Sequence, residues 1–174
     1  MSRRASQVRR LAWAAALGLL ALAAGSPPSG APTAVDQHGT PHAWRGPFER
    51  LTVLDFAAAW CGPCRYTLPR MEVYARQHPE IQVLVVSVDE KVEGRDQLVS
   101  SLGIELPVLW DEGHAIARHF EPEALPTTLV LDTEGTEIHR YLGSSDRGWD
   151  ELVAFLESQR EAQAEGQDEE GRSD

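Results

Sequence analysis

The sequence predicts an α/β domain whose sheet has a mostly parallel centre. Short apolar runs rich in β-branched residues alternate with segments of helical periodicity, which is typical of strand–helix–strand units. One run, Ile81–Val88, is apolar almost throughout, as expected for a strand buried on both faces. About 110 to 120 ordered residues are enough to form a single hydrophobic core. Because crossovers between parallel strands are right-handed, few topologies remain possible.

The individual elements follow the local pattern of apolar and turn-forming residues. Pro69 should kink the first helix, because its ring removes one backbone hydrogen bond. Gly103 should end the second helix, and Asp111 should cap the third. In chain order we expect a strand at 51–56, a helix at 64–78, a strand at 81–88, a helix at 94–102, a strand at 106–110, a helix at 111–120, strands at 127–131 and 137–142, and a last helix beginning at 145 or 146.

Both ends of the chain differ in composition from this core. Met1–Arg10 carries four arginines and no acid, and Leu11–Ala24 is apolar. This pattern indicates a signal peptide at 1–24, or an uncleaved N-terminal anchor, although the apolar run is short for a bilayer span of about 20 residues. The domains expected from composition are a linker at 25–34, a folded domain at 35–159 and an acidic disordered tail at 160–174.

The charge balance excludes some classes of partner. With 16 basic and 27 acidic residues the formal charge is −11, and removal of the four leader arginines would take it to about −15. Such a surface argues against binding to nucleic acid or to anionic membrane surfaces. Any contact with a membrane is therefore expected only through the N-terminal segment, if it is not cleaved.

The chain has two cysteines, Cys61 and Cys64, and they are separated by Gly62-Pro63 directly after the apolar run at 51–56. Two thiols at this spacing can form a small disulfide ring. If Cys61 opens a helix, free backbone N–H groups and the helix dipole favour its thiolate, which is the attacking species. The motif therefore indicates dithiol–disulfide exchange.

Two other interpretations of the cysteine pair are weaker. A structural zinc site takes about four ligands, and the chain has no second cysteine pair and no suitably spaced histidines, so we expect no metal. A purely structural disulfide across so short a loop would remove little entropy from the unfolded chain.

The segment around the cysteines resembles the active-site segment of thioredoxins. It reads Phe56-Ala57-Ala58-Ala59-Trp60-Cys61-Gly62-Pro63-Cys64-Arg65. The likeness extends to Asp55, to Pro69 and to Leu125-Pro126-Thr127, which resembles the cis-proline loop of the family. It covers roughly residues 35–159. The resemblance implies a thioredoxin fold, with a central mixed sheet flanked by helices, an N-terminal hairpin and an inserted helix–strand segment.

Within that family the chain is similar to the TlpA/ResA group of exported thiol–disulfide oxidoreductases. Asp36-x-x-Gly39 followed by Trp44-Arg45-Gly46 resembles the N-terminal hairpin of the group, and Val92–Trp110 supplies the extra helix and strand. The run from Leu125 to Gly135 resembles its PTT…D-x-x-G pattern. Two features, Gly62-Pro63 and Asp55, depart from many members and favour general thioredoxin chemistry.

The resemblance implies a role for each residue of the site. Cys61 would be the nucleophile, Cys64 the resolving thiol, and Asp55 the proton acceptor for Cys64. Without the resemblance, Asp55 could equally be a capping or solvent-facing residue at a strand end, and Trp60 could pack on the core. The residues expected to contact the substrate are Trp60, Gly62, Pro63, Leu125, Pro126 and Thr127.

The expected function is reduction of protein disulfides in the periplasm or cell envelope by a monomer that needs no cofactor. A role in maturation of cytochrome c or of metalloproteins is one expectation, with a membrane thiol carrier as electron donor. Two alternatives stay open, a peroxiredoxin-like peroxidase and a non-catalytic binding or assembly module. Ala58 argues against the peroxidase, because that site would have Thr or Ser there, and the intact cysteine pair argues against the binding module.

Overall fold

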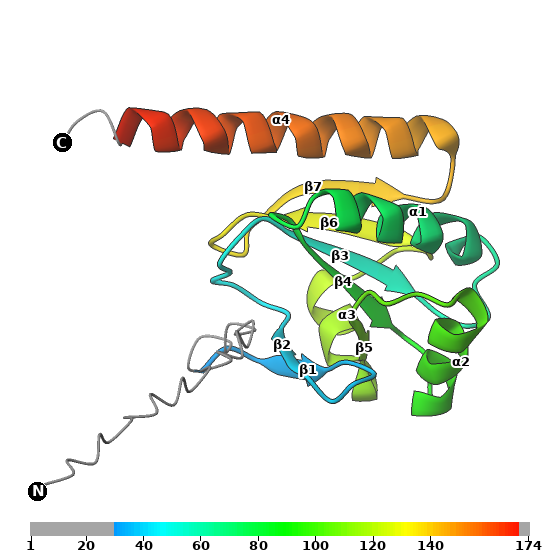
Figure 1. The fold of residues 1–174 in the computed structure, drawn as a ribbon. Coiled ribbons are helices and arrows are strands. Elements are labelled where there is room, and N and C mark those ends of the chain that lie inside the picture. Colours follow the sequence, from blue (N-terminus) through cyan, green and yellow to red (C-terminus); the bar gives the residue numbers. More distant parts are fainter. Residues whose placement is uncertain (1–29, 171–174) are drawn as a thin grey trace, which may run out of the picture.

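The computed structural model describes residues 30–170 and shows two sheets (Figure 1). The leader expected at 1–24 and most of the linker lie outside these residues. The elements in chain order are β1 Thr33–Val35, β2 Pro41–Ala43, β3 Thr52–Ala57, α1 Cys64–Gln77, β4 Gln82–Ser87, α2 Val92–Leu102, β5 Val108–Trp110, the 3₁₀ turn η1 Glu112–His114, α3 Ala115–Phe120, β6 Thr127–Leu131, β7 Glu137–Leu142 and α4 Asp146–Glu170.

The main sheet has five strands in the order β5-β4-β3-β6-β7. β3 pairs parallel with β4, and β4 with β5, whereas β6 runs antiparallel to β3 and β7 antiparallel to β6. This is the mixed sheet with a parallel centre that the sequence predicted. It confirms the fold class, including the separate β1–β2 hairpin.

The side chains of the central strands pack into two clusters, one on each face of the sheet. Alternate residues of β3 point to opposite faces. Val53 joins the cluster that includes residues of α1, α2 and α4, and Leu54 joins the one that includes residues of α3 and the hairpin. Figure 1 shows α1 and α4 over one face of the sheet and the hairpin below the other.

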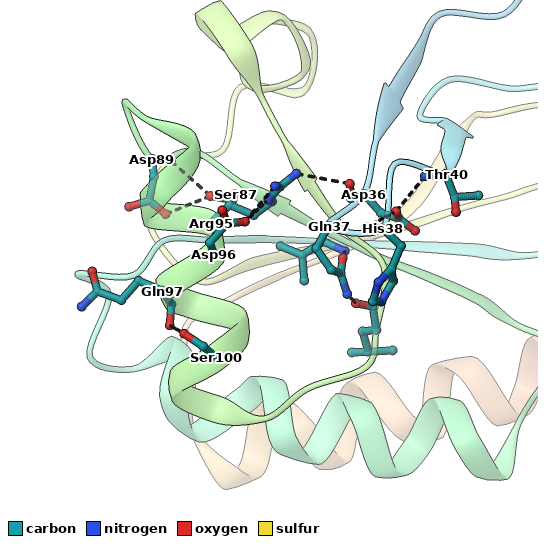
Figure 2. A network of polar contacts seen from close by, with 12 residues as sticks. Asp36, Gln37, His38, Thr40, Ser87, Asp89, Arg95, Asp96, Gln97 and Ser100 are labelled. Carbon is teal, nitrogen blue, oxygen red and sulfur yellow. Dashed lines mark hydrogen bonds and ion pairs between the residues drawn. The ribbon is translucent and has the colours of Figure 1, made fainter.

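The hairpin is fixed to the main domain by a polar network (Figure 2). The Asp36 carboxylate accepts hydrogen bonds from the N–H groups of His38 and Thr40. Its backbone carbonyl accepts from Arg95 of α2 at 3.2 Å. The Gln37 side chain pairs with the backbone on both sides of Pro107, since it donates to the Leu106 carbonyl and accepts from the N–H of Val108. The hairpin is therefore attached to the inserted helix–strand segment.

Three expectations about the elements need correction. The expected helix at 111–120 is interrupted, because Gly113 and His114 adopt left-handed φ values of 66° and 57°, and α3 begins only at Ala115. The Asp111 carboxylate nevertheless accepts from the N–H groups of Ile116 and Ala117, so it caps α3. The strand expected at 106–110 begins only at Val108.

The third correction concerns the C-terminus, where an acidic disordered tail was expected from residue 160. Instead α4 continues to Glu170. The added segment is rich in Ala, Glu and Gln, which are strong helix formers even without an apolar face.

Within the described residues, none of the helices has the length and apolarity needed to cross a bilayer.

Candidate redox-active site

The two cysteines form a disulfide between the end of β3 and the start of α1. The Cα atoms of Cys61 and Cys64 are 5.4 Å apart, within the usual range for a disulfide. Cys64 is the first residue of α1 and Pro63 is its N-cap, so Cys61 precedes the helix rather than opening it. The expected start of this helix at Cys64 is therefore confirmed, whereas the condition that Cys61 opens the helix is not met.

The two sulfur-bearing residues differ in access. Cys61 keeps 4% of its surface exposed and lines a groove, whereas Cys64 is fully buried. The order of access makes Cys61 the cysteine that an incoming sulfur can reach.

The backbone N–H of Cys64 points at the Sγ atom of Cys61, at an N···S distance of 3.2 Å. A hydrogen bond to a charged acceptor is stronger than one to a neutral acceptor, so this N–H favours the thiolate when the disulfide is reduced. The start of α1 adds the positive end of the helix dipole. The stabilisation expected from a helix N-terminus is thus present although Cys61 lies outside the helix.

Asp55 lies in the middle of β3, not at the strand end that we expected. Its neighbours Val53 and Ala57 belong to the same cluster as Cys61 and Cys64, and strand alternation places the carboxylate on that face. Neither carboxylate oxygen has a hydrogen-bond partner among the described residues. Burial raises the pKa of Asp55 to about 8. A carboxyl group that titrates there can exchange a proton near neutral pH.

Cys61 lies at the edge of a groove of about 640 Å³. Four of the residues expected to contact a substrate line this groove, namely Trp60, Gly62, Pro63 and Leu125. Trp60 has 71% of its surface exposed, so it does not pack into the core. The lining is largely apolar, which suits the binding of an extended polypeptide on either side of a substrate cysteine.

The other two expected contact residues are placed differently. The Leu125–Pro126 bond is cis, as expected. Pro126 is buried and its carbonyl accepts from the N–H of Gly143, while Thr127 is fully buried in β6. The backbone N–H and C=O of Leu125 make no backbone hydrogen bond within residues 30–170. Of these three residues, the geometry leaves Leu125 available to a substrate.

Sequence reasoning missed three polar residues of the site. His114 and Glu123 line the groove, and Asp89 holds the loop that precedes Cys61. Asp89 follows β4, and a polar residue at the carboxyl end of a parallel strand was a signal that could have found it. The segment with His114 was expected to be one regular helix, so nothing indicated that this side chain reaches the groove. In residues 30–170 no three His, Cys, Asp or Glu side chains converge as a metal site would require.

Comparisons with known proteins lead to one family. The family model described as Thioredoxin-like matches residues 49–137. The mitochondrial thioredoxin of Bos taurus is 30% identical over 109 residues, which make up 62% of this chain and 51% of that protein. The thiol-disulfide oxidoreductase ResA of Bacillus thuringiensis (strain Al Hakam) is 26% identical over 105 residues, 59% of this chain and 60% of that protein. The chain thus spans between half and three fifths of the length of these two relatives.

A solved structure agrees on the fold. The Chlorobium tepidum protein described as the thiol:disulfide interchange protein DsbE superposes with a TM-score of 0.66, over 72% of this chain and 90% of that one. At 22% sequence identity this likeness shows the shared fold.

Proposed function

This chain belongs to the thioredoxin-like family, and on that premise we propose that it is a thiol–disulfide oxidoreductase that reduces protein disulfides through Cys61 and Cys64. The observation that carries the proposal is the Cys61–Cys64 disulfide, placed with one cysteine in a groove and the other fully buried. This asymmetry separates an attacking thiol from a resolving thiol.

In the first step the Cys61 thiolate attacks one sulfur of a substrate disulfide. A bond forms between the Cys61 Sγ and that sulfur, the substrate S–S bond breaks, and the other substrate sulfur leaves as a thiolate. The product is a mixed disulfide. The N–H of Cys64 and the start of α1 favour the thiolate that begins this step.

In the second step Cys64 loses its proton to the Asp55 carboxylate and attacks the Sγ of Cys61. The mixed disulfide breaks, the second substrate thiolate leaves, and the Cys61–Cys64 disulfide forms. Two electrons have then passed to the substrate. The burial of Asp55 on the same face as the cysteines supports this role, because a desolvated carboxylate is a stronger base.

The groove is the surface on which the substrate chain would lie. Trp60 and Leu125 offer apolar contact beside the sulfur, with Gly62 and Pro63 next to it. The free backbone groups of Leu125 can pair with an extended substrate strand, as in β-strand addition. Pro126 and Thr127 would act by shaping this loop.

The proposal places the reaction outside the cytoplasm, in the periplasm or cell envelope. It is supported by the arginine-rich start and the apolar run that follows. An exported reductant needs electrons from the cytoplasm, so a membrane thiol carrier is the proposed donor. The proposed substrates are oxidised cysteines of exported proteins, with apocytochrome c and metalloprotein precursors among them.

The test is capture of the mixed disulfide. Cys64→Ser protein, reduced and mixed with an oxidised substrate such as insulin, should form a covalent adduct that dithiothreitol releases. Cys61→Ser should form none and should lose activity. No adduct with Cys64→Ser, together with activity retained by Cys61→Ser, would refute the assignment. A peroxide-consumption assay on the same proteins distinguishes the proposed disulfide reductase from the alternative, a peroxiredoxin-like peroxidase.

The direction of transfer is tested by the reduction potential of the pair. A Gly-Pro dipeptide between the cysteines is like that of thioredoxin, for which the potential is about −270 mV. A potential near about −120 mV, the value of a strong oxidant, would reverse the proposed direction.

A further inference from the structure

Asp89 lies two residues after the end of β4, next to the loop that carries Cys61. Only 6% of the surface of Asp89 is exposed. Both carboxylate oxygens accept from the backbone N–H of Ala59, at 3.3 and 3.0 Å. Ala59 is two residues before Cys61, so this contact holds the turn from which Trp60 and Cys61 project.

Residues of β4 and of the inserted segment surround Asp89. The hydroxyl of Ser87 donates to it at 2.8 Å, as the network in Figure 2 shows. Gly94 of α2 packs so closely that a Cβ there would lie 2.5 Å from the Cβ and Cγ of Asp89. The indole N–H of Trp110 donates to the Asp89 backbone carbonyl at 3.0 Å. Groups from β4, α2 and β5 therefore determine where the carboxylate lies.

The other side of the same loop residue is also held. The guanidinium of Arg65 in α1 donates to the Ala59 carbonyl at 3.5 Å and to the hydroxyl of Ser101 in α2 at 3.3 Å. Ala59 thus has its N–H bound by a buried anion and its C=O bound by an exposed cation. Both contacts lead from the cysteine loop to α2 or to the residues that pack against it.

We propose that Asp89 is a positioning residue for thiol–disulfide exchange, which holds the Ala59–Cys61 turn in place and, as a buried negative charge beside it, disfavours the Cys61 thiolate. The inference rests on the proposed function of the cysteine pair. Destabilising the thiolate destabilises the reduced form, so Asp89 makes the protein a stronger reductant. It opposes the Cys64 N–H and the helix dipole, which act in the other direction.

The charges that surround this turn have distinct positions. Arg65 lies on the exposed side of Ala59, and Asp55 is buried within β3 itself. Glu90, next in sequence, is exposed and lies 3.6 Å from His114, so solvent screens it. Asp89 differs from these in combining burial with direct hydrogen bonds to the turn.

The test compares Asp89→Asn with a matched control. Asparagine keeps an oxygen acceptor for the Ala59 N–H but removes the charge. Glu93→Gln removes the same charge at an exposed position in the first turn of α2. The exchange equilibrium of the Cys61–Cys64 pair with glutathione is measured for each protein, together with the pH profile of Cys61 alkylation by iodoacetamide.

We expect Asp89→Asn to shift the equilibrium toward the dithiol by roughly tenfold, or about 30 mV for this two-electron couple. The alkylation profile should move to lower pH. Glu93→Gln should leave both within about twofold, because exposed charges are screened. If both variants show the same exchange equilibrium and the same alkylation profile, Asp89 is only a structural residue. This holds even if its replacement lowers the melting temperature.

A second variant keeps the proposal testable if Asp89→Asn does not fold. Ser87→Ala removes the hydroxyl that donates to the carboxylate and leaves the charge less compensated. The equilibrium should then shift toward the disulfide, opposite to Asp89→Asn, and an unchanged or reversed shift would overturn the proposal. Both measurements use glutathione and iodoacetamide rather than a protein substrate. They stay informative if no mixed disulfide is captured, an outcome that would count against the proposed function alone.

Discussion

The Nε2 atom of His42 lies 2.9 Å from the Oδ2 atom of Asp36, across the N-terminal hairpin. The same carboxylate accepts two backbone hydrogen bonds, and the Asp36 carbonyl accepts one from Arg95. One residue therefore closes the hairpin and ties it to α2. Because α2 also packs against Asp89, the hairpin and the cysteine loop are attached to the same inserted segment.

The Asp36–His42 contact predicts a pH-dependent contribution to stability. Burial alone would raise the pKa of Asp36, but the hydrogen bonds from His42, Thr40 and His38 outweigh it and hold the pKa below its usual value. A depressed pKa gives stability that is present above the unfolded pKa of about 3.8 and is lost as pH falls below it.

Asp36→Asn should therefore cost about 1 kcal/mol of unfolding free energy at pH 7. At pH 3 the cost should be smaller, since the unfolded state is then mostly protonated and part of the advantage of the ionised Asp36 is lost. Urea unfolding followed by tryptophan fluorescence at the two pH values measures this. Asp150→Asn, at an exposed position of α4, is the control for loss of one charge. An equal cost at both pH values would contradict the prediction.

Asp55 predicts the opposite dependence on pH. Its pKa is about 8 in the folded protein and about 3.8 unfolded, so between these values the folded state holds a proton that the unfolded state has lost. Wild-type stability should fall as pH rises from 4 to 8 and level off above. Asp55→Asn removes this dependence and should be more stable by roughly 5 kcal/mol at pH 9, with little difference at pH 4. Denaturant unfolding of the oxidised proteins across this range is the measurement.

The same residue predicts the pH dependence of the second chemical step. A proton acceptor works only when ionised, so the rate at which Cys64 resolves the mixed disulfide should rise as pH passes through about 8. In Asp55→Asn that rise should be lost, so the rate above about pH 8 should be lower than in the wild type, while the first attack by Cys61 is little changed. Stopped-flow measurement on a preformed mixed disulfide separates the steps. An unaltered profile in the variant would remove Asp55 from the mechanism.

Much of the fold could be predicted because local patterns and global topology agree. The bounds of β6 and β7 coincide with the expected strands at 127–131 and 137–142, since each is a short run closed by turn residues. The cysteine pair was found because its chemistry is unusual within an apolar context, and Asp55 because the segment around it resembles the thioredoxin active site. The interruption at Gly113 and His114 was missed, because a left-handed histidine leaves no periodic signal.

The parts of the site that could not be predicted depend on contacts between distant residues. Asp89 binds Ala59, which is 30 positions away in the sequence. Thr127 is buried because β6 lies between β3 and β7, and Pro126 precedes it with its carbonyl bonded to the Gly143 N–H; the sequence does not report such depth. Leu125 and Thr127 lie two residues apart in one expected contact set, yet only Leu125 lines the groove.

Because only some of the expected contact residues line the groove, we predict that these residues determine substrate specificity. Trp60 and Leu125 are far apart in the sequence, but both line the groove. Neither makes a hydrogen bond to the sulfur atoms of the cysteines. Trp60→Ala should therefore raise KM for protein disulfides by roughly tenfold, the loss of one large apolar contact of about 1–2 kcal/mol. The reduction potential should stay within a few millivolts of the wild type, because no charge or hydrogen bond near Cys61 changes.

Insulin reduction at varied substrate concentration gives KM, and equilibration with glutathione gives the potential. Tyr66→Ala, which removes a half-exposed aromatic side chain of α1 that does not line the groove, is the control and should leave KM unchanged. A fall in kcat or a shifted potential in Trp60→Ala, with KM unaltered, would mean that Trp60 acts on the sulfur chemistry and not on the substrate chain.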